Sequence, residues 1–137
     1  MKWLTHVMAS LLFLKAFGML FNVPALVFCV LGALAPDIDE KSSKLGRVFH
    51  IPFSRHRGII HSAWPWLFIG VAVSLFSRPA GYGFLIGSLS HLFLDTLTPQ
   101  GARLFYPAKL RLKGPIRTGS FSEMLLLAGI IGLFLLA

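Results

Sequence analysis

The stretch Gly87–Gly101, GSLSHLFLDTLTPQG, decides how the chain is interpreted, because it is apolar yet carries two ionisable side chains in its interior. His91 and Asp95 are four residues apart, so on a helix both side chains lie on one face. An imidazole and a carboxylate in apolar surroundings need a partner that offsets their loss of water. The stretch therefore predicts a helix whose polar pair holds either a neighbouring helix or a ligand.

The composition of the whole chain favours a membrane protein. Of its 137 residues, 55% are hydrophobic and only 13% are charged, whereas soluble domains have about 25% charged residues. The length indicates one domain, residues 1–137. The single cysteine, Cys29, excludes an internal disulfide framework.

Five apolar segments predict an all-α fold, a polytopic membrane bundle with about four transmembrane helices and one short or re-entrant helix. A helix needs about 20 residues to cross a bilayer, and the second segment is too short for this. The break at Asn22-Val23-Pro24 predicts a helical hairpin of the first two segments. The N-terminal segment resembles a signal peptide, but it has no convincing cleavage site and is interpreted as a retained helix. The segments cover about 3–21, 24–35, 61–77, 82–97 and 121–137.

The net charge of +8 is distributed unevenly over the loops. If the segments alternate across the membrane, the turn Arg78-Pro79-Ala80-Gly81 is the one basic loop on its side. Positive residues mark the cytoplasmic side, so we expect a bacterial inner-membrane protein, multi-pass, with a cytoplasmic N-terminus. No nucleic-acid-binding motif accompanies the charge, and no nucleic-acid partner is expected. The cytoplasmic set is Lys2, Lys41, Lys44, Arg47, Arg55, Arg57, Arg103, Lys109, Arg111, Lys113 and Arg117.

The same topology gathers the acidic and imidazole side chains at the cytoplasmic face. They come from the start of the first segment, the end of the second, the start of the third and the last two turns of the fourth. Ionisable residues at membrane depth are costly and usually mark a functional site. The set comprises His6, Asp37, Asp39, His56, His61, His91 and Asp95.

Imidazole and carboxylate groups are typical ligands of divalent metals. We therefore expect one or two ions of zinc, manganese or magnesium. His6 and His56 would be ligands or proton-transfer groups, and Arg57 would clamp a phosphate. Two simpler interpretations stay open, a hydrogen-bonded pair that joins helices and a solvated acidic loop. The expected metal ligands are Asp37, Asp39, His61, His91 and Asp95.

The fifth acidic residue, Glu123, has a different interpretation. Ser120-Phe121-Ser122-Glu123 has the spacing of a capping box, with Ser120 as the N-cap and Glu123 at the third helical position. The pattern predicts a structural role for Glu123 at the start of the last helix.

Three motifs resemble the YdjM-like family of inner-membrane, metal-dependent hydrolases, described as LexA-regulated or LexA-binding. They are LGALAPDIDE at 31–40, HRGIIHS at 56–62, and GSLSHLFLDTLTPQG followed by Tyr106-Pro107. The resemblance implies a metal-dependent hydrolase at the membrane and the same site residues, with Arg57 and Gly58 in the HRG turn. Ile60 stands where the family commonly has threonine, so no hydroxyl role is expected there.

The leading hypothesis is a membrane-bound hydrolase that cleaves a phosphate ester of a lipid or lipid-linked anionic substrate. One alternative is a metal-independent lipid phosphatase in which His91 is the nucleophile and Asp95 orients it. Such enzymes share the H-x-x-x-D motif, but the chain lacks their Pro-Ser-Gly-His tract and would leave the paired aspartates without a role. Another alternative is a small membrane scaffold or regulator without enzymatic activity.

Overall fold

The computed structural model describes residues 1–39, 61–108 and 110–136. Within these residues the chain forms five α-helices and a 3-10 helix, and its β-structure is limited to an isolated antiparallel bridge between Ala102 and Leu112. The predicted all-α class is confirmed for the described part of the chain. The elements are α1 (Trp3–Ala16), α2 (Val23–Leu34), η1 (Ala35–Asp39), α3 (Ala63–Phe76), α4 (Arg78–Thr96) and α5 (Phe121–Leu136).

Helix α1 is shorter than the apolar run that predicted it. The helix ends at Ala16, and Gly18 adopts a left-handed conformation with φ of 68°. The N–H of Gly18 donates to the carbonyl of Lys15 at 2.8 Å, and the N–H of Met19 donates to the carbonyl of Leu14 at 3.1 Å. These two bonds form a Schellman motif, which stops a helix whatever the hydropathy of the next residues.

Helix α4 is longer than predicted, and the expected turn at Arg78-Pro79-Ala80-Gly81 is wrong. These four residues form the first turn of α4. The side chain of Ser77 accepts a hydrogen bond from the N–H of Ala80, and Pro79 fits the first turn because its missing N–H needs no helical acceptor there. Ser77 therefore separates α3 from α4 by a single residue.

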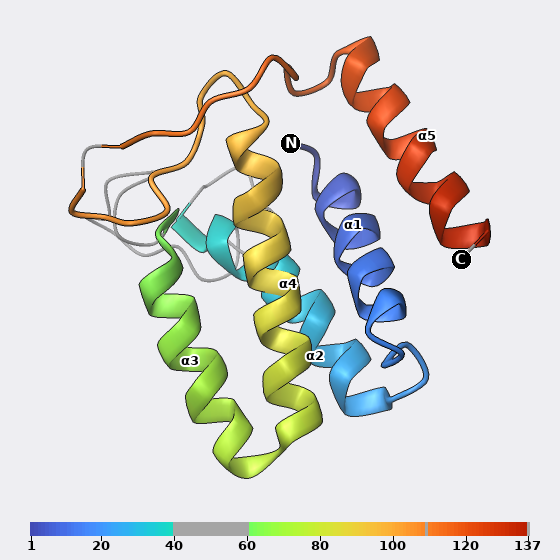
Figure 1. The fold of residues 1–137 in the computed structure, drawn as a ribbon, viewed down its shortest axis with the longest axis vertical. Coiled ribbons are helices and arrows are strands. Elements are labelled where there is room, and N and C mark those ends of the chain that lie inside the picture. The colour runs from blue at the N-terminus through green and yellow to red at the C-terminus, as the bar shows by residue number, and fades with distance from the viewer. Residues whose placement is uncertain (40–60, 109, 137) are drawn as a thin grey trace.

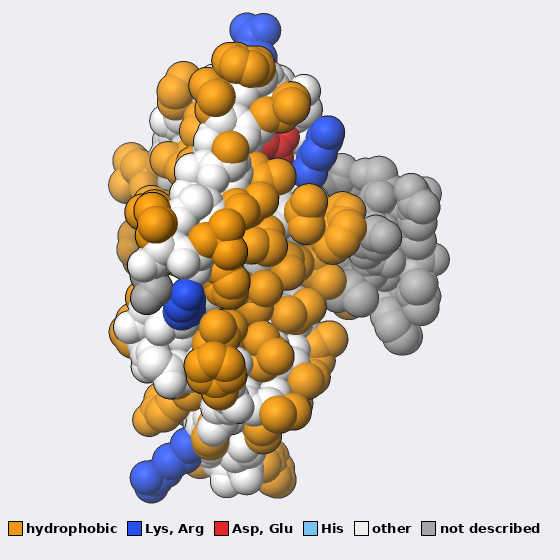
Figure 2. Space-filling model, turned by 90° about the vertical axis from the view of Figure 1, so that its right-hand side faces the viewer, with side chains coloured by type: hydrophobic (Ala, Val, Ile, Leu, Met, Phe, Trp, Pro, Cys, Tyr) orange, Lys and Arg blue, Asp and Glu red, His pale blue; other side chains and the backbone are white. Residues whose placement is uncertain are grey.

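The expected polytopic bundle is not supported by the helices that form. Among residues 1–39, 61–108 and 110–136, no helix combines the length and the apolarity that a membrane crossing needs. Large apolar side chains are nevertheless exposed on every α-helix. Figure 2 shows them spread over the face that lies to the right in Figure 1, with few basic side chains between them.

Helix α4 lies at the centre of the molecule, between α3 and α1, and α2 crosses it (Figure 1). The backbones of α2 and α4 are in direct contact. A Cβ atom added to Gly83 would lie 2.1 Å from the carbonyl oxygen of Ala25, and one added to Gly87 would lie 2.1 Å from that of Cys29. Glycine at these positions allows the close approach, which brings the end of α2 to the C-terminal half of α4.

Helix α5 packs against α1, and the two helices run in the same direction (Figure 1). At one end of the pair, the Lys15 ammonium donates to the carbonyl of Phe134 at 2.6 Å and lies 4.8 Å from the centre of that ring. At the other end, the carboxylate of Glu123 accepts hydrogen bonds from Lys2, the N-cap of α1, and from Thr5 in its first turn. Between these polar contacts, Ala9, Leu94 and Ile130 form a small apolar core.

Half of the expected capping box is present at the start of α5. The Ser120 hydroxyl accepts a hydrogen bond from the N–H of Glu123 at 3.4 Å. The Glu123 carboxylate does not return to the N–H of Ser120, which donates to Arg117 instead. One oxygen of the Glu123 carboxylate accepts from the N–H of Gly119 at 2.5 Å, and the other oxygen is directed to α1.

We expect the Lys15→Met substitution to weaken the α1–α5 pair by about 1.5–3 kcal/mol, the range for a hydrogen bond with a charged partner. Methionine keeps most of the apolar stem but removes the donor to Phe134. Thermal unfolding in detergent, followed by circular dichroism, measures the change. Lys2→Met is the control, because the Lys2 side chain is exposed; equal stability of both variants would contradict the expected role of Lys15.

Candidate metal centre

The His91 ring is fixed by the packing of α2 on α4. Gly83, Gly87, His91 and Asp95 follow one another at intervals of four residues, so they form a single stripe along α4. The close approach of the two helices places the carbonyl of Ala33 2.7 Å from the Nδ1 atom of His91. Because a carbonyl can only accept, Nδ1 carries the proton, and the neutral form of the ring then offers the lone pair of Nε2 to the site. Metal-binding histidines are commonly oriented by this kind of contact.

Four side chains place their donor atoms side by side, and they come from three separate segments. Asp37 belongs to η1, His61 precedes α3, and His91 and Asp95 belong to α4. The Nε2 atom of His61 lies 3.5 Å from Asp37 Oδ1 and 3.5 Å from Asp95 Oδ2. The Nε2 atom of His91 lies 3.4 Å from Asp37 Oδ1 and 3.8 Å from Asp95 Oδ2. These four atoms, here called the four-donor set, close into a ring.

Three of the four contacts in the four-donor set, at 3.4–3.5 Å, have the spacing of a site for a small divalent ion, and the fourth, between His91 and Asp95, is longer at 3.8 Å. Around a four-coordinate ion with bonds of about 2.0–2.2 Å, neighbouring ligand atoms lie about 3.3–3.6 Å apart. The donor types, two imidazoles and two carboxylates, are those of zinc and manganese sites. His61 and His91 are fully buried, Asp95 is 2% exposed and Asp37 is 19% exposed, so three of the four donors are already withdrawn from water.

The Asp37 carboxylate is held in its charged form. Burial alone would raise its pKa, but the interactions with His61, His91 and His6 together outweigh burial and lower the pKa far below the ordinary value of an aspartate. A deprotonated carboxylate is the form that binds a metal.

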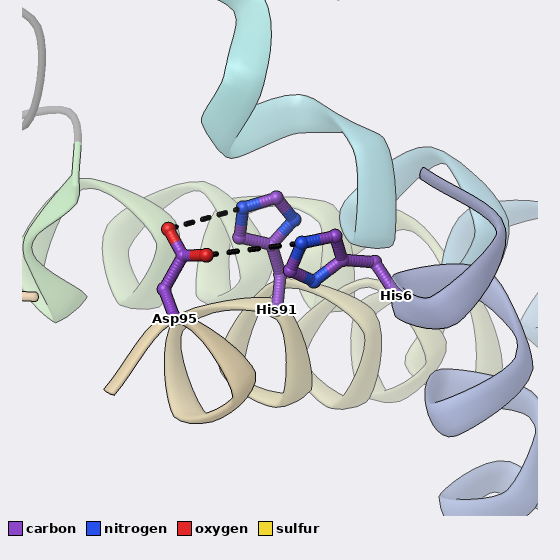
Figure 3. A group of neighbouring side chains, drawn as sticks. All are labelled: His6, His91 and Asp95. Carbon is purple, nitrogen blue, oxygen red and sulfur yellow. Dashed lines mark ion pairs between the residues drawn. The ribbon is translucent and has the colours of Figure 1, made fainter. Parts of the chain in front are cut away.

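His6 lies beside the four-donor set and stacks on His91 (Figure 3). The two ring centres are 3.8 Å apart and the ring planes differ by 12°. Since an imidazole lone pair lies in the plane of its ring, two parallel stacked rings cannot direct their lone pairs at the same ion. The Nε2 atom of His6 instead faces Asp95 Oδ1 at 3.8 Å, the oxygen that lies outside the four-donor set. The Met1 amino group lies 3.7 Å from the same oxygen.

Two histidines carry buried nitrogen atoms that receive no hydrogen bond from the described part of the chain. They are Nδ1 and Nε2 of His6, and Nε2 of His91. Buried polar atoms in native proteins are almost always satisfied, so these nitrogens indicate a ligand, an ion or a water in the site.

The structure brings five of the sequence-predicted residues together, namely His6, Asp37, His61, His91 and Asp95. His56 and Arg57 lie outside the described residues. Asp39 ends η1, but its side chain also lies outside the described part. The roles expected for these three residues stay predictions.

Two contributors to the site were not predicted from the sequence. The Ala33 carbonyl is a backbone group, for which no side-chain pattern exists. The link from Glu123 to α1 was not predicted, because the capping-box pattern already gave Glu123 a role at the start of its own helix. The four-residue spacing of Gly83, Gly87, His91 and Asp95 was visible, and it could have predicted that the polar pair faces a closely packed helix.

Comparisons with known proteins agree on one family. Residues 1–137 match the family described as "YdjM inner membrane protein". The protein is 33% identical to the uncharacterized protein YvsG of Bacillus subtilis, over 92% of this chain and 87% of that protein. It is 35% identical to the inner membrane protein YdjM of Escherichia coli, over 64% of this chain and 51% of that protein, so it spans about half of this relative. No solved structure matches.

Proposed function

The chain belongs to the YdjM inner membrane protein family, and from this premise we propose that it is a metal-dependent hydrolase. Its metal centre would be the four-donor set, Asp37, His61, His91 and Asp95, with at least one ion of zinc, manganese or magnesium. The observation that carries the proposal is the closed ring of two imidazoles and two carboxylates with contacts of 3.4–3.8 Å. A divalent cation bound there would offset the cost of withdrawing the two carboxylates from water.

When bound, the ion supplies Lewis acidity toward an ester oxygen and the attacking water. The residues of the chain supply the remaining functions. The Ala33 carbonyl fixes the ring of His91, and Asp95 uses one oxygen in the four-donor set and the other toward His6. The Nε2 atom of His6 is therefore placed to accept a proton at the edge of the centre and to return it to a leaving group.

A phosphate ester of a lipid or lipid-linked anionic molecule is the proposed substrate. The exposed apolar side chains of the helices suit contact with lipid. The segment 97–120, which follows the site end of α4, carries Arg103, Arg111, Lys113 and Arg117, and such groups attract anionic headgroups.

We extend the proposal to a location in the bacterial inner membrane, multi-pass, with the N-terminus and the site on the cytoplasmic side. His56 and Arg57 keep their proposed roles in proton transfer and phosphate binding.

Elemental analysis of detergent-purified protein tests the metal centre. We expect at least one divalent ion per wild-type chain and a loss of that ion in Asp95→Asn, which keeps the shape of the side chain but removes its charge. Circular dichroism would check that the variant keeps its helices. A wild-type protein that is free of divalent metal, after purification without chelators, would overturn the proposal.

Hydrolysis of a lipid phosphate in vesicles separates the metal-dependent hydrolase from the two alternatives. The metal-dependent enzyme loses turnover with a strong chelator and regains it with zinc or manganese. A phosphohistidine enzyme would be insensitive to the chelator, and a scaffold would show no turnover in either condition. The geometry disfavours His91 as a nucleophile, because its Nε2 atom faces Asp37 at 3.4 Å and Asp95 at 3.8 Å. Two carboxylates would repel an incoming phosphate.

A further inference from the structure

We propose that Glu123 is a positioning residue for His6, which it acts on through the first turn of α1. The inference rests on the proposed function, in which His6 transfers protons at the edge of the four-donor set. The two residues are far apart in sequence, and Glu123 belongs to a helix that contributes no donor atom to the centre.

The Glu123 carboxylate accepts three hydrogen bonds from the described residues, and two of them come from the start of α1 and its N-cap. Its Oε1 atom accepts from the backbone N–H of Lys2 at 2.6 Å and from the hydroxyl of Thr5 at 3.0 Å. Its Oε2 atom accepts from the N–H of Gly119 at 2.5 Å. Charge-assisted hydrogen bonds of this kind are stronger than those between neutral groups. Glu123 is only 3% exposed and Thr5 only 1%, so water offers little competition for either group.

A capping role does not explain this arrangement. A carboxylate in the first turn of a helix normally serves the free N–H groups of its own helix start, and the bond to Gly119 belongs to that class. The bonds to Lys2 and Thr5 join residues 121 and 118 positions apart. They fix the start of α1 relative to the start of α5.

His6 depends on this fixed backbone for its position. Neither ring nitrogen makes a hydrogen bond with the described part of the chain, so no such bond orients the ring. Its orientation comes from the stacking on His91, from the contact with Asp95 at 3.8 Å and from the backbone of the first turn of α1. The hydroxyl of Thr5, the residue just before His6, donates a hydrogen bond to the Glu123 carboxylate. Loss of Glu123 would free this turn and let the ring of His6 leave His91.

Substitutions of Glu123 separate this positioning role from capping. Glu123→Gln keeps an oxygen for Lys2 and Thr5 but places an amide NH₂ opposite the N–H of Gly119, so the cap is lost and the link to α1 is kept. Glu123→Ala removes both. Lys15→Met is the matched control, because it removes the other polar contact of the α1–α5 pair, at the end away from His6.

Nuclear magnetic resonance of metal-free, ¹⁵N-histidine-labelled protein in detergent gives the readout, with His6 assigned through His6→Gln. In the wild type, the ring protons of His6 should show the ring-current shift that stacking on His91 produces. We expect this shift to be lost in Glu123→Ala, retained in Glu123→Gln and retained in Lys15→Met. If Glu123→Ala does not fold, Thr5→Val replaces it, with a reduced shift expected and Thr5→Ser as the control.

Two results would overturn the inference. One is an unchanged His6 shift in Glu123→Ala, or in Thr5→Val where that variant replaces it. The other is an equal loss of the shift in Lys15→Met, which would mean that the general docking of α5, and not Glu123, holds His6. A zinc titration of the same samples separates this test from that of the proposed function. Failure of the wild type to bind zinc would refute the metal centre, whereas the shift of the metal-free protein reports on the positioning of His6 alone.

Discussion

The Gly87→Ala variant is expected to lose stability and metal binding together. The added Cβ atom would lie 2.1 Å from the carbonyl oxygen of Cys29 and 2.7 Å from the backbone nitrogen of Ala33. Both contacts are with backbone, so α2 has to move away from α4. Overpacking of this kind costs about 1–3 kcal/mol, occasionally more. The movement also withdraws the Ala33 carbonyl from His91, so we expect a fall of about 10–100-fold in zinc affinity, the usual effect of removing an outer support of a ligand.

Gly129→Ala is the matched control for this substitution. Gly129 also lies within a helix, α5, but an added Cβ atom there meets no described atom within 4 Å beyond its chain neighbours and the adjacent backbone of its own helix. Alanine should therefore stabilise the helix by up to about 1 kcal/mol through its better helix propensity. Thermal unfolding and a competitive zinc titration measure both variants. Wild-type zinc affinity in a destabilised Gly87→Ala protein would show that the α2–α4 approach does not support the metal centre.

The largest loss of metal affinity is expected from substitutions within the four-donor set. His61→Gln, His91→Gln, Asp37→Asn and Asp95→Asn should each lower zinc affinity by more than about 100-fold, which is the upper end of the effect of an outer support. His6→Gln should lower it by less than about 10-fold. The difference follows from the parallel stacking of His6 on His91, which directs its lone pair away from the ion that His91 would bind.

A competition titration with a zinc chelator of known affinity measures this order. The effect of His6→Gln on lipid phosphate hydrolysis should be much larger than its effect on affinity, because His6 is proposed to move protons. A loss of affinity in His6→Gln as large as that in His91→Gln would assign His6 to the ligands and contradict the arrangement proposed here.

Much of the helical architecture could be predicted from the apolar runs, whereas the helix ends could not. Hydropathy continues past Ala16, but the left-handed Gly18 stops α1 there. Arg78 and Pro79 were interpreted as a turn because they interrupt an apolar pattern, yet an N-cap from Ser77 makes them a helix start. These local contacts shorten α1 and lengthen α4. The helix lengths, which were expected to match the thickness of a bilayer, therefore depend on helix caps as well as on hydropathy.

The site could be predicted only as a gathering of residue types at one end of the bundle. The alternation of segments placed imidazoles and carboxylates at a common level, and His6, Asp37, His61, His91 and Asp95 do meet there. Which atoms face one another depends on the distance between α2 and α4 and on the rotation of each helix. Packing contacts set these two quantities. The different placement of His6 and His61 around Asp95 therefore required the structure.

The contact between His91 and the Ala33 carbonyl has a consequence for how the site responds to mutation. Its acceptor is part of the main chain, so every amino acid at position 33 would still offer it. Scanning mutagenesis by side-chain truncation cannot remove this acceptor. Its contribution would be detected only indirectly, through substitutions of distant glycines that displace α2. A backbone amide-to-ester replacement between Ala33 and Leu34, which weakens the carbonyl as an acceptor and also removes the N–H of Leu34, would test the contribution at the main chain.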